Sequence, residues 1–256
     1  MSEFNWYGTY TLSIREIRRF LKVYHQTIIA PVISALIFLS IFSLALGSSE
    51  KMIHNIPYQD FAGYGLIIMT IIQNSFANTS SSLIMAKVIG YINDILMPPF
   101  EGKELIVAYN IGSICRGLLV GLLLTCILSF IIKLRLHDIS LTIYYVLTAT
   151  ILLGNLGLLS SVITDNFDQN SAITSYIITP LSFLSGTFYS IHDLPSWIKL
   201  INLVNPFFYI IDGFRFSLIG YSDGNIMFGI FYLLSLNIIL TFLIIKIIDS
   251  GWKLKP

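Results

Sequence analysis

The stretch FLSGTFYSIHDLPSW, from Phe183 to Trp197, begins like a membrane-spanning helix and then interrupts it. Gly186, Asp193 and Pro195 follow the apolar start, and residues of these types break a helix at the point where it could leave the bilayer. The same mixture continues to residue 225, too apolar for a solvated loop and too interrupted for one straight helix. Backbone groups at membrane depth need partners, which a hairpin sheltered by protein provides.

Two short helices are expected within this stretch. The first runs from Pro195 to Leu203, and Asn205-Pro206 ends it and begins the second, because proline disfavours a helical residue before it and suits the first helical turn. In the second helix Asp212 and Arg215 have the i,i+3 spacing of an ion pair. We therefore predict that 189–225 is a re-entrant helical hairpin at the outer face.

The composition is that of an integral membrane protein. Of 256 residues, 55% are hydrophobic and 11% charged, and the mean hydropathy is +0.78, whereas ordinary soluble domains are roughly 25% charged. A net charge of +1 gives no reason to expect a nucleic-acid partner. We expect a single domain over 1–256, an all-α polytopic membrane protein with six transmembrane helices. The spans are placed at 27–46, 61–83, 105–132, 141–163, 172–188 and 226–248.

The distribution of Lys and Arg predicts the orientation. Connections on the cytoplasmic side of bacterial inner-membrane proteins carry the excess of these residues. One set of connections is rich in them, and it includes both chain ends and the loop between the second and third spans. Both termini are therefore expected in the cytoplasm, and the hairpin outside.

Two elements on the predicted cytoplasmic side have the pattern of contact surfaces. Residues 1–26 predict an amphipathic helix lying in the membrane interface, with a basic face that meets lipid or a cytosolic partner. The connection 84–104 predicts a short helix over Lys87–Met97, which Pro98-Pro99 stops. The basic face of the first helix consists of Arg15, Arg18, Arg19 and Lys22.

Polar residues inside the predicted spans allow two interpretations. The second span ends in QNSFANTSSSL, where Asn74 and Asn78 either bond neighbouring helices or line a transport pathway. Arg116 is expected about one turn inside the third span, where its side chain either reaches the headgroups or takes part in the substrate path. Gly117 and Gly121 form a G-x-x-x-G, which permits close helix contact and marks a candidate dimer contact.

Five motifs, in order along almost the whole chain, carry a family resemblance. They are ANTSSSL, YINDILMPP, RGLLVG, TPLSFLSGTFYSIHDLPSW and LVNPFFYIIDGFR. Together with the basic interfacial helix they resemble ABC-2-type exporter permeases, in particular the YadH-like branch. The resemblance implies a membrane subunit that pairs with a second copy of itself and with a separate cytosolic ATPase, which binds ATP and Mg.

The resemblance also implies roles for particular residues. The family's coupling helix falls on Lys87, Gly90, Tyr91, Asn93, Asp94 and Met97, with Arg15, Arg18 and Arg19 of the first helix beside it. Two positions depart from the family pattern: Asn93 replaces a common acidic residue, and Pro98 replaces alanine before Pro99. The outer gate falls on Phe183, Phe188, Tyr189, Asn205, Pro206 and Tyr209, and Asn74 and Asn78 are expected on the path.

The sequence contains no motif for nucleotide or metal chemistry. The nearest match to a phosphate-binding loop is Gly102-Lys103, which has Met97 where the first glycine belongs and Glu104 where serine or threonine belongs. The four histidines are dispersed, and no metal-ligand spacing occurs. We expect no catalytic residues, no metal and no cofactor in this chain, and a cargo such as an amphipathic drug, a lipid or a lipid-linked glycan.

Two other functions remain open at this point. A carrier driven by an ion gradient would need acidic residues at mid-membrane and repeated halves, and neither is visible. A membrane scaffold without transport would need no gated hairpin, and the polar second span weakly opposes it.

Overall fold

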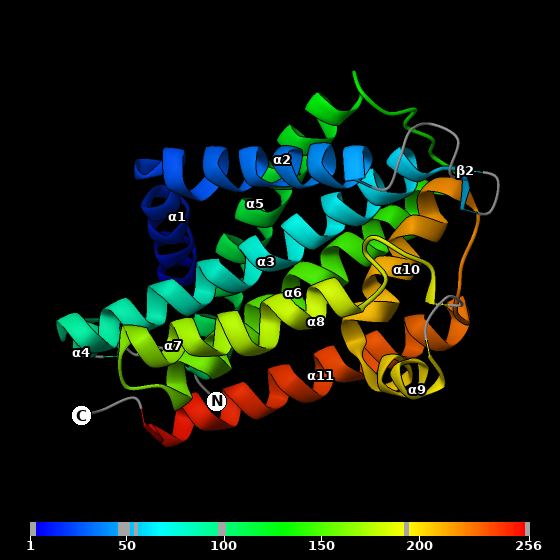
Figure 1. The fold of residues 1–256 in the computed structure, drawn as a ribbon. Helices are drawn as coiled ribbons and strands as arrows, with labels where there is room; N and C mark the ends of the chain where they lie inside the picture. Colours follow the sequence, from blue (N-terminus) through cyan, green and yellow to red (C-terminus); the bar gives the residue numbers. More distant parts are fainter. Residues whose placement is uncertain (1–3, 46–51, 54–55, 97–100, 192–194, 254–256) are drawn as a thin grey trace.

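A computed structural model describes residues 4–45, 52–53, 56–96, 101–191 and 195–253, and this part of the chain is almost entirely helical (Figure 1). One small antiparallel pair joins β1 (Met52–Ile53) to β2 (Ile56–Pro57). Four helices are long and apolar enough to cross a membrane: His25–Leu44, Gly102–Leu128, Ile139–Ile163 and Ile226–Ser250.

The centre of the bundle is α3 (Tyr58–Ile89), a helix of 32 residues that is buried along most of its length. It is packed against α2 (Ala30–Ala45), α5 (Gly102–Leu128) and α6 (Ile139–Ile163). A π-helical turn, η1 (His25–Ile29), precedes α2. The expected second span lies within α3, and its polar residues reflect contact with other helices on nearly every side.

The expected fifth span lies in a helical run over 167–184 that contains a π-helical turn. It consists of α7 (Phe167–Ile173), a π-helical turn η2 (Thr174–Ile178) and α8 (Thr179–Leu184). Pro180, in the first turn of α8, has no N–H to continue the hydrogen-bond ladder, and π-turns occur where that ladder is disturbed. This helical run overlaps the predicted span of 172–188, but it begins at Phe167 and ends at Leu184.

The two ends of the bundle carry different elements (Figure 1). α1 (Trp6–Lys22), α4 (Ile92–Leu96) and the end of α11 (Ile226–Ser250) lie at one end. The β-hairpin, α9 (Ser196–Val204) and α10 (Pro206–Ile219) lie at the other. The N-terminal helix and the α3–α5 connection thus share one end, opposite the predicted hairpin.

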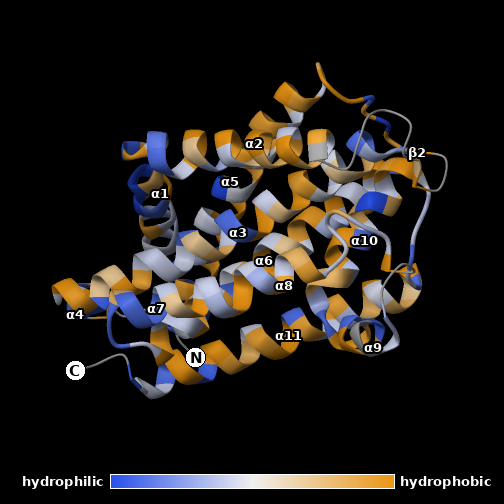
Figure 2. Cartoon of the chain, in the orientation of Figure 1, coloured by the Kyte–Doolittle hydropathy of each residue, from blue (hydrophilic) through white to orange (hydrophobic). Residues whose placement is uncertain are grey.

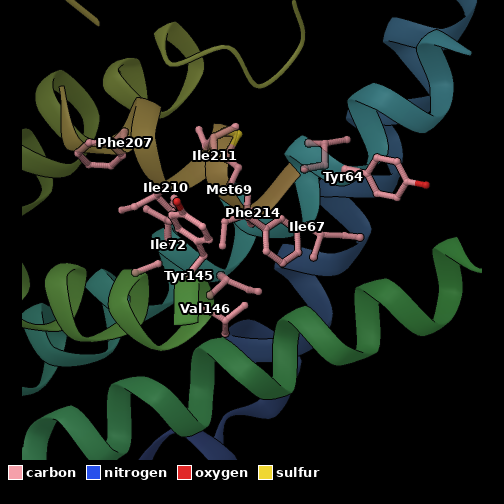
Figure 3. Close-up of a cluster of buried hydrophobic side chains, with 14 of the residues drawn as sticks. Tyr64, Ile67, Met69, Ile72, Tyr145, Val146, Phe207, Ile210, Ile211 and Phe214 are labelled. Carbon is pink, nitrogen blue, oxygen red and sulfur yellow. The ribbon is translucent and has the colours of Figure 1, made fainter. Parts of the chain in front are cut away.

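The hairpin contains the two expected helices, and the second belongs to the core. Figure 3 shows Ile211 and Phe214 of α10 beside Tyr145 of α6 and Ile72 of α3, all in one hydrophobic cluster. α10 begins where predicted, because the Asn205 side chain accepts a hydrogen bond from the Phe207 N–H at 3.0 Å. The chain therefore turns back onto the bundle after α9.

α2 and α11 consist mostly of hydrophobic residues (Figure 2). On α2, Ile33, Ile37 and Ile41 are each about half exposed, and Phe231 and Ile238 of α11 are more so. A continuous apolar surface of this kind fits lipid contact along both helices.

Candidate functional site

The predicted coupling helix is divided between two helices. α3 continues to Ile89, and Gly90 then adopts a left-handed conformation with φ of +92° that ends it. α4 follows, with Ile92 and Ile95 buried against the bundle. The prediction of one helix over Lys87–Met97 was therefore wrong at its start. The helical spacing of apolar residues continues past Gly90, although the backbone turns at this glycine. Met97 lies outside the described residues.

Within α4 the two polar residues point away from the bundle. Asn93 and Asp94 are exposed, and Tyr91, just before the helix, is half-buried. The exposed carboxylate of Asp94 is thus available to a partner at the end of the bundle that also carries α1.

Lys87 has a role inside the chain. Its Nζ donates hydrogen bonds to the carbonyl oxygens of Ser161, Val162 and Thr164, at 3.0, 3.1 and 2.6 Å. These carbonyls belong to the end of α6, where the helix leaves its last acceptors unpaired. Lys87 therefore caps α6, a contact that couples the end of α3 to the end of α6.

The buried face of α1 is polar. Glu16 is fully buried, accepts a hydrogen bond from Ser82 Oγ at 2.9 Å and pairs with Arg19 at 3.2 Å. Arg19 in turn donates to the backbone oxygen of Asn78 at 2.7 Å. Of the three predicted coupling arginines, Arg19 thus faces the bundle and fixes α1 to α3.

The other two arginines border a groove. The guanidinium of Arg15 lies over the Tyr91 ring at 5.2 Å, which ties α1 to the loop before α4. Arg18 is exposed. Between α1 and the end of α3 lies a cavity of about 780 Å³ with basic and aromatic walls, lined by Tyr10, Ile14, Arg15, Arg18, Lys22, Met85 and Tyr91.

The polar residues of α3 divide between the two predicted roles. Thr79 donates to the carbonyl oxygen of Gly154 in α6 at 2.7 Å, and Ser80 accepts from Ser161 at 2.8 Å. Asn78 faces α1 through Arg19. These residues hold helices together, and Asn78 bonds α1.

Asn74, one turn earlier, faces a cavity of about 390 Å³ between α2, α3 and η2. Its Oδ1 accepts a hydrogen bond from Nη2 of Arg116 at 3.1 Å. Arg116 is near the middle of α5 and only 7% exposed. The expectation that it reaches the headgroups was wrong, because α5 begins a turn earlier than the apolar pattern suggests and α3 receives the guanidinium.

Four aromatic rings are in contact between α2 and the stretch after α8. Phe42 of α2 stacks on Phe188 with centroids 4.3 Å apart, and Phe188 stacks on Phe183 at 5.6 Å. Phe38, which also lines the cavity, meets Phe183 edge-on at 5.8 Å. The structure thus brings two predicted gate residues together with two rings of α2 that sequence reasoning missed, since nothing distinguishes them within an apolar span.

The remaining predicted gate residues occupy two places. Tyr189 Oη donates to the Phe183 carbonyl at 3.2 Å, and Asn205 Nδ2 donates to Ser185 Oγ at 2.7 Å, so both brace the bend after α8. Tyr209 contacts α11 instead, with its ring centroid 5.2 Å from that of Tyr232. Pro206 is the first residue of α10.

Asp212 and Arg215 take separate partners, so the expected ion pair between them was wrong. Asp212 accepts hydrogen bonds from the N–H groups of Asp223 and Gly224, at 2.8 and 2.9 Å. Arg215 Nη2 donates to the carbonyl oxygens of Gly186 and Thr187, at 2.7 and 3.3 Å.

The guanidinium of Arg215 also lies over the Phe61 ring of α3 at 3.6 Å. One buried arginine of α10 therefore holds the bend after α8, the stretch that interrupts the fifth span. The charge of Arg215 within a hydrophobic helix was the sequence signal for a buried structural role. Its spacing from Asp212, however, suggested Asp212 as the partner.

The G-x-x-x-G of α5 is used within the chain. A Cβ on Gly117 would lie 2.3 Å from Ser75 Oγ, and one on Gly121 would lie 2.5 Å from Ile71 Cγ1. Both glycines thus allow α5 to approach α3, and this contact occupies the surface that was a candidate for dimer contact.

Long apolar helices around a polar, cavity-lining centre define a multi-pass membrane protein suited to transport. The ABC-2 type transporter family model matches residues 7–219. The chain is 34% identical over 224 residues to the inner membrane transport permease YadH of Escherichia coli K12, covering 87% of each chain. It is 25% identical over 220 residues to a transport permease named ycf38 from Cyanophora paradoxa, covering 79% of this chain and 70% of that one.

The chain therefore belongs to the ABC-2 type transporter family. It is a multi-pass inner-membrane transport permease, as the five sequence motifs indicated.

Proposed function

We propose that this permease is the membrane subunit of an ABC exporter, driven by a separate cytosolic ATPase that binds ATP and Mg. The observation that carries the proposal is the end of the bundle formed by α1 and α4. There the exposed carboxylate of Asp94 and the basic groove bordered by Arg15 and Arg18 lie together, held in place by Arg19 and Lys87. A surface with both charges can orient a partner through complementary charge.

The path in this proposal runs through the cavity beside Asn74 and past the aromatic rings of the bend. Its walls come from α2, α3 and η2, and α2 carries an apolar outward surface. A second copy of the chain packed on this side completes the enclosure. The cargo is then an amphipathic molecule, such as a drug, a lipid or a lipid-linked glycan, because the cavity has apolar walls and a polar end.

In this arrangement both termini and α4 face the cytoplasm, and 189–225 forms a re-entrant hairpin at the outer face. The excess of Lys and Arg at the α1 and α4 end supports that orientation. The buried position of α10 supports a hairpin sheltered by protein.

The positions of the acidic residues favour this proposal over an ion-driven carrier. Glu16 and Glu104 are buried at the α1 end of the bundle, and Asp60 and Asp212 at the other end. Coupling to an ion gradient calls for carboxylates near mid-membrane.

Replacing Asp94 with Lys is expected to separate the permease from its ATPase. Reversing the sign of a docking carboxylate removes an attraction and adds a repulsion, a change of roughly 1 to 3 kcal/mol in association. The measurement is the amount of ATPase that co-purifies with the tagged permease, and the ATP turnover of that complex.

The matched control is Asp168→Lys, the same substitution at an exposed position in the first turn of α7. Both variants should keep the wild-type unfolding temperature. Normal ATPase content and turnover in Asp94→Lys would show that α4 is not the docking helix.

A further inference from the structure

The cavity between α2, α3 and η2 has a charged end and an apolar wall. Arg116 supplies the charge. The volume of the cavity, about 390 Å³, is in the range of small-molecule sites. Polar residues of the lining include Thr70, Gln73 and Asn74, and Asn74 contacts the guanidinium. The apolar wall includes Phe38, Leu66 and Met69.

The guanidinium of Arg116 has more donors than the chain satisfies. Nη2 donates to Asn74 Oδ1 at 3.1 Å, whereas the Nε atom is buried without a hydrogen-bond partner. Arginine presents five N–H donors, and a buried cation with unused donors is unfavourable unless an anion meets it. A side chain that is 7% exposed at a cavity wall has little access to water as a substitute.

The chain provides no such anion among its described residues. Among these residues Arg116 forms no ion pair. The charge that acts on its guanidinium is that of Arg19, which is also a cation. The carboxylate of Glu16 already pairs with Arg19 and bonds Ser82. The missing negative charge therefore has to come from a molecule that enters the cavity.

We propose that this cavity binds the anionic headgroup of an amphiphile, a phosphate-type group held by Arg116, with the apolar tail along Phe38, Leu66 and Met69. Arginine suits this ligand because its planar fork can give two parallel hydrogen bonds to phosphate oxygens. The inference deepens the proposed function, since it names the cargo class for a cavity on the proposed path. Binding itself requires neither the ATPase nor turnover.

The test measures binding of dodecyl phosphate to the purified full-length chain in an uncharged detergent, by titration calorimetry. Dodecylphosphocholine, with the same tail and no net charge, and inorganic phosphate, with no tail, are the comparison probes. Wild type should bind dodecyl phosphate at least about tenfold more tightly than either one.

Two variants remove the free charge in different ways. Arg116→Gln deletes the cation, and Asn74→Asp places a carboxylate beside Nη2 at almost unchanged volume, so that an internal pair replaces the ligand. Both should weaken dodecyl phosphate binding about 30-fold or more. Controls are Lys133→Gln, which removes an exposed charge, and Asn225→Asp, which keeps a helix cap. These should bind within about twofold of wild type.

Wild-type affinity in a folded Asn74→Asp variant would overturn the proposal, even if Arg116→Gln fails to fold. Equal binding of the zwitterionic probe would also overturn it. Inorganic phosphate bound as tightly as dodecyl phosphate would overturn the amphiphile and leave a phosphate site. Failure of the ATPase proposal would be seen in the amount of co-purified ATPase and not in dodecyl phosphate binding. Asp94→Lys should bind dodecyl phosphate as wild type does.

Discussion

Arg215→Ala is expected to destabilise the end of the bundle that carries α9 and α10 by about 4 kcal/mol. The guanidinium donates to the Gly186 and Thr187 carbonyls and lies 3.6 Å from the Phe61 ring centroid. Hydrogen bonds from a charged donor contribute roughly 1.5 to 3 kcal/mol, and a desolvated cation–π contact about 2 kcal/mol. Removing the side chain also leaves two carbonyl oxygens of the bend without this donor.

The measurement is the unfolding temperature of the purified chain, which should fall by about 8 to 16 °C for a loss of this size. Arg135→Ala is the control, because the Arg135 side chain is exposed and its hydrogen bond to Tyr64 Oη comes from the backbone N–H, which alanine keeps. Arg215→Lys should recover part of the loss, since it keeps the charge but not the planar fork. Equal unfolding temperatures for Arg215→Ala and wild type would show that the bend does not depend on this residue.

Phe42→Ala combined with Phe188→Ala is expected to make the permease leak without ATP. The two rings are stacked at 4.3 Å across the seam between α2 and the bend, and Phe188 is buried. Truncating a packed phenylalanine removes roughly 3 to 5 kcal/mol in a protein core. Even about 2 kcal/mol lost from the closed state alone would raise the open fraction about 30-fold.

The measurement is the flux of a small dye or of ions through proteoliposomes, with insertion of the variant verified. Phe231→Ala with Phe242→Ala removes two aromatic side chains from the exposed surface of α11 and should not change the flux. If the flux through the Phe42→Ala, Phe188→Ala variant equals that of wild type, the two rings have a structural role and do not form a gate.

The sequence predicts the start of α10 at Asn205-Pro206, whereas it misses the end of α3 at Gly90. Asn205 and Asn225 cap α10 and α11 with their side chains, and Gly220 ends α10 in the left-handed conformation. Such signals are local, so they need no knowledge of neighbouring helices. The break after Phe183 was foreseen from Gly186 and Pro195, whereas the π-helical turn before Pro180 was not.

The partners of buried polar residues could not be predicted in the same way. Lys87 and Arg19 both belong to basic patterns that suggested an exposed surface, yet each bonds carbonyl oxygens of another helix. A helical pattern gives the face on which a residue lies, but not which helix packs on that face. For the same reason Arg116 was placed near the headgroups, and the cavity beside it became visible only with α2 and η2 in position.

The central claim is tested most directly by measuring ATP hydrolysis in two preparations of the tagged permease. One is isolated from the membrane of its own host, where its ATPase partner is present, and the other is expressed without that partner. The account predicts turnover in the complex, loss of most of that turnover with Asp94→Lys, and no hydrolysis or nucleotide binding by the lone chain. The sequence basis is the missing phosphate-binding loop at Gly102-Lys103. Saturable ATP binding to the lone chain, or a complex without any ATPase, would contradict the account.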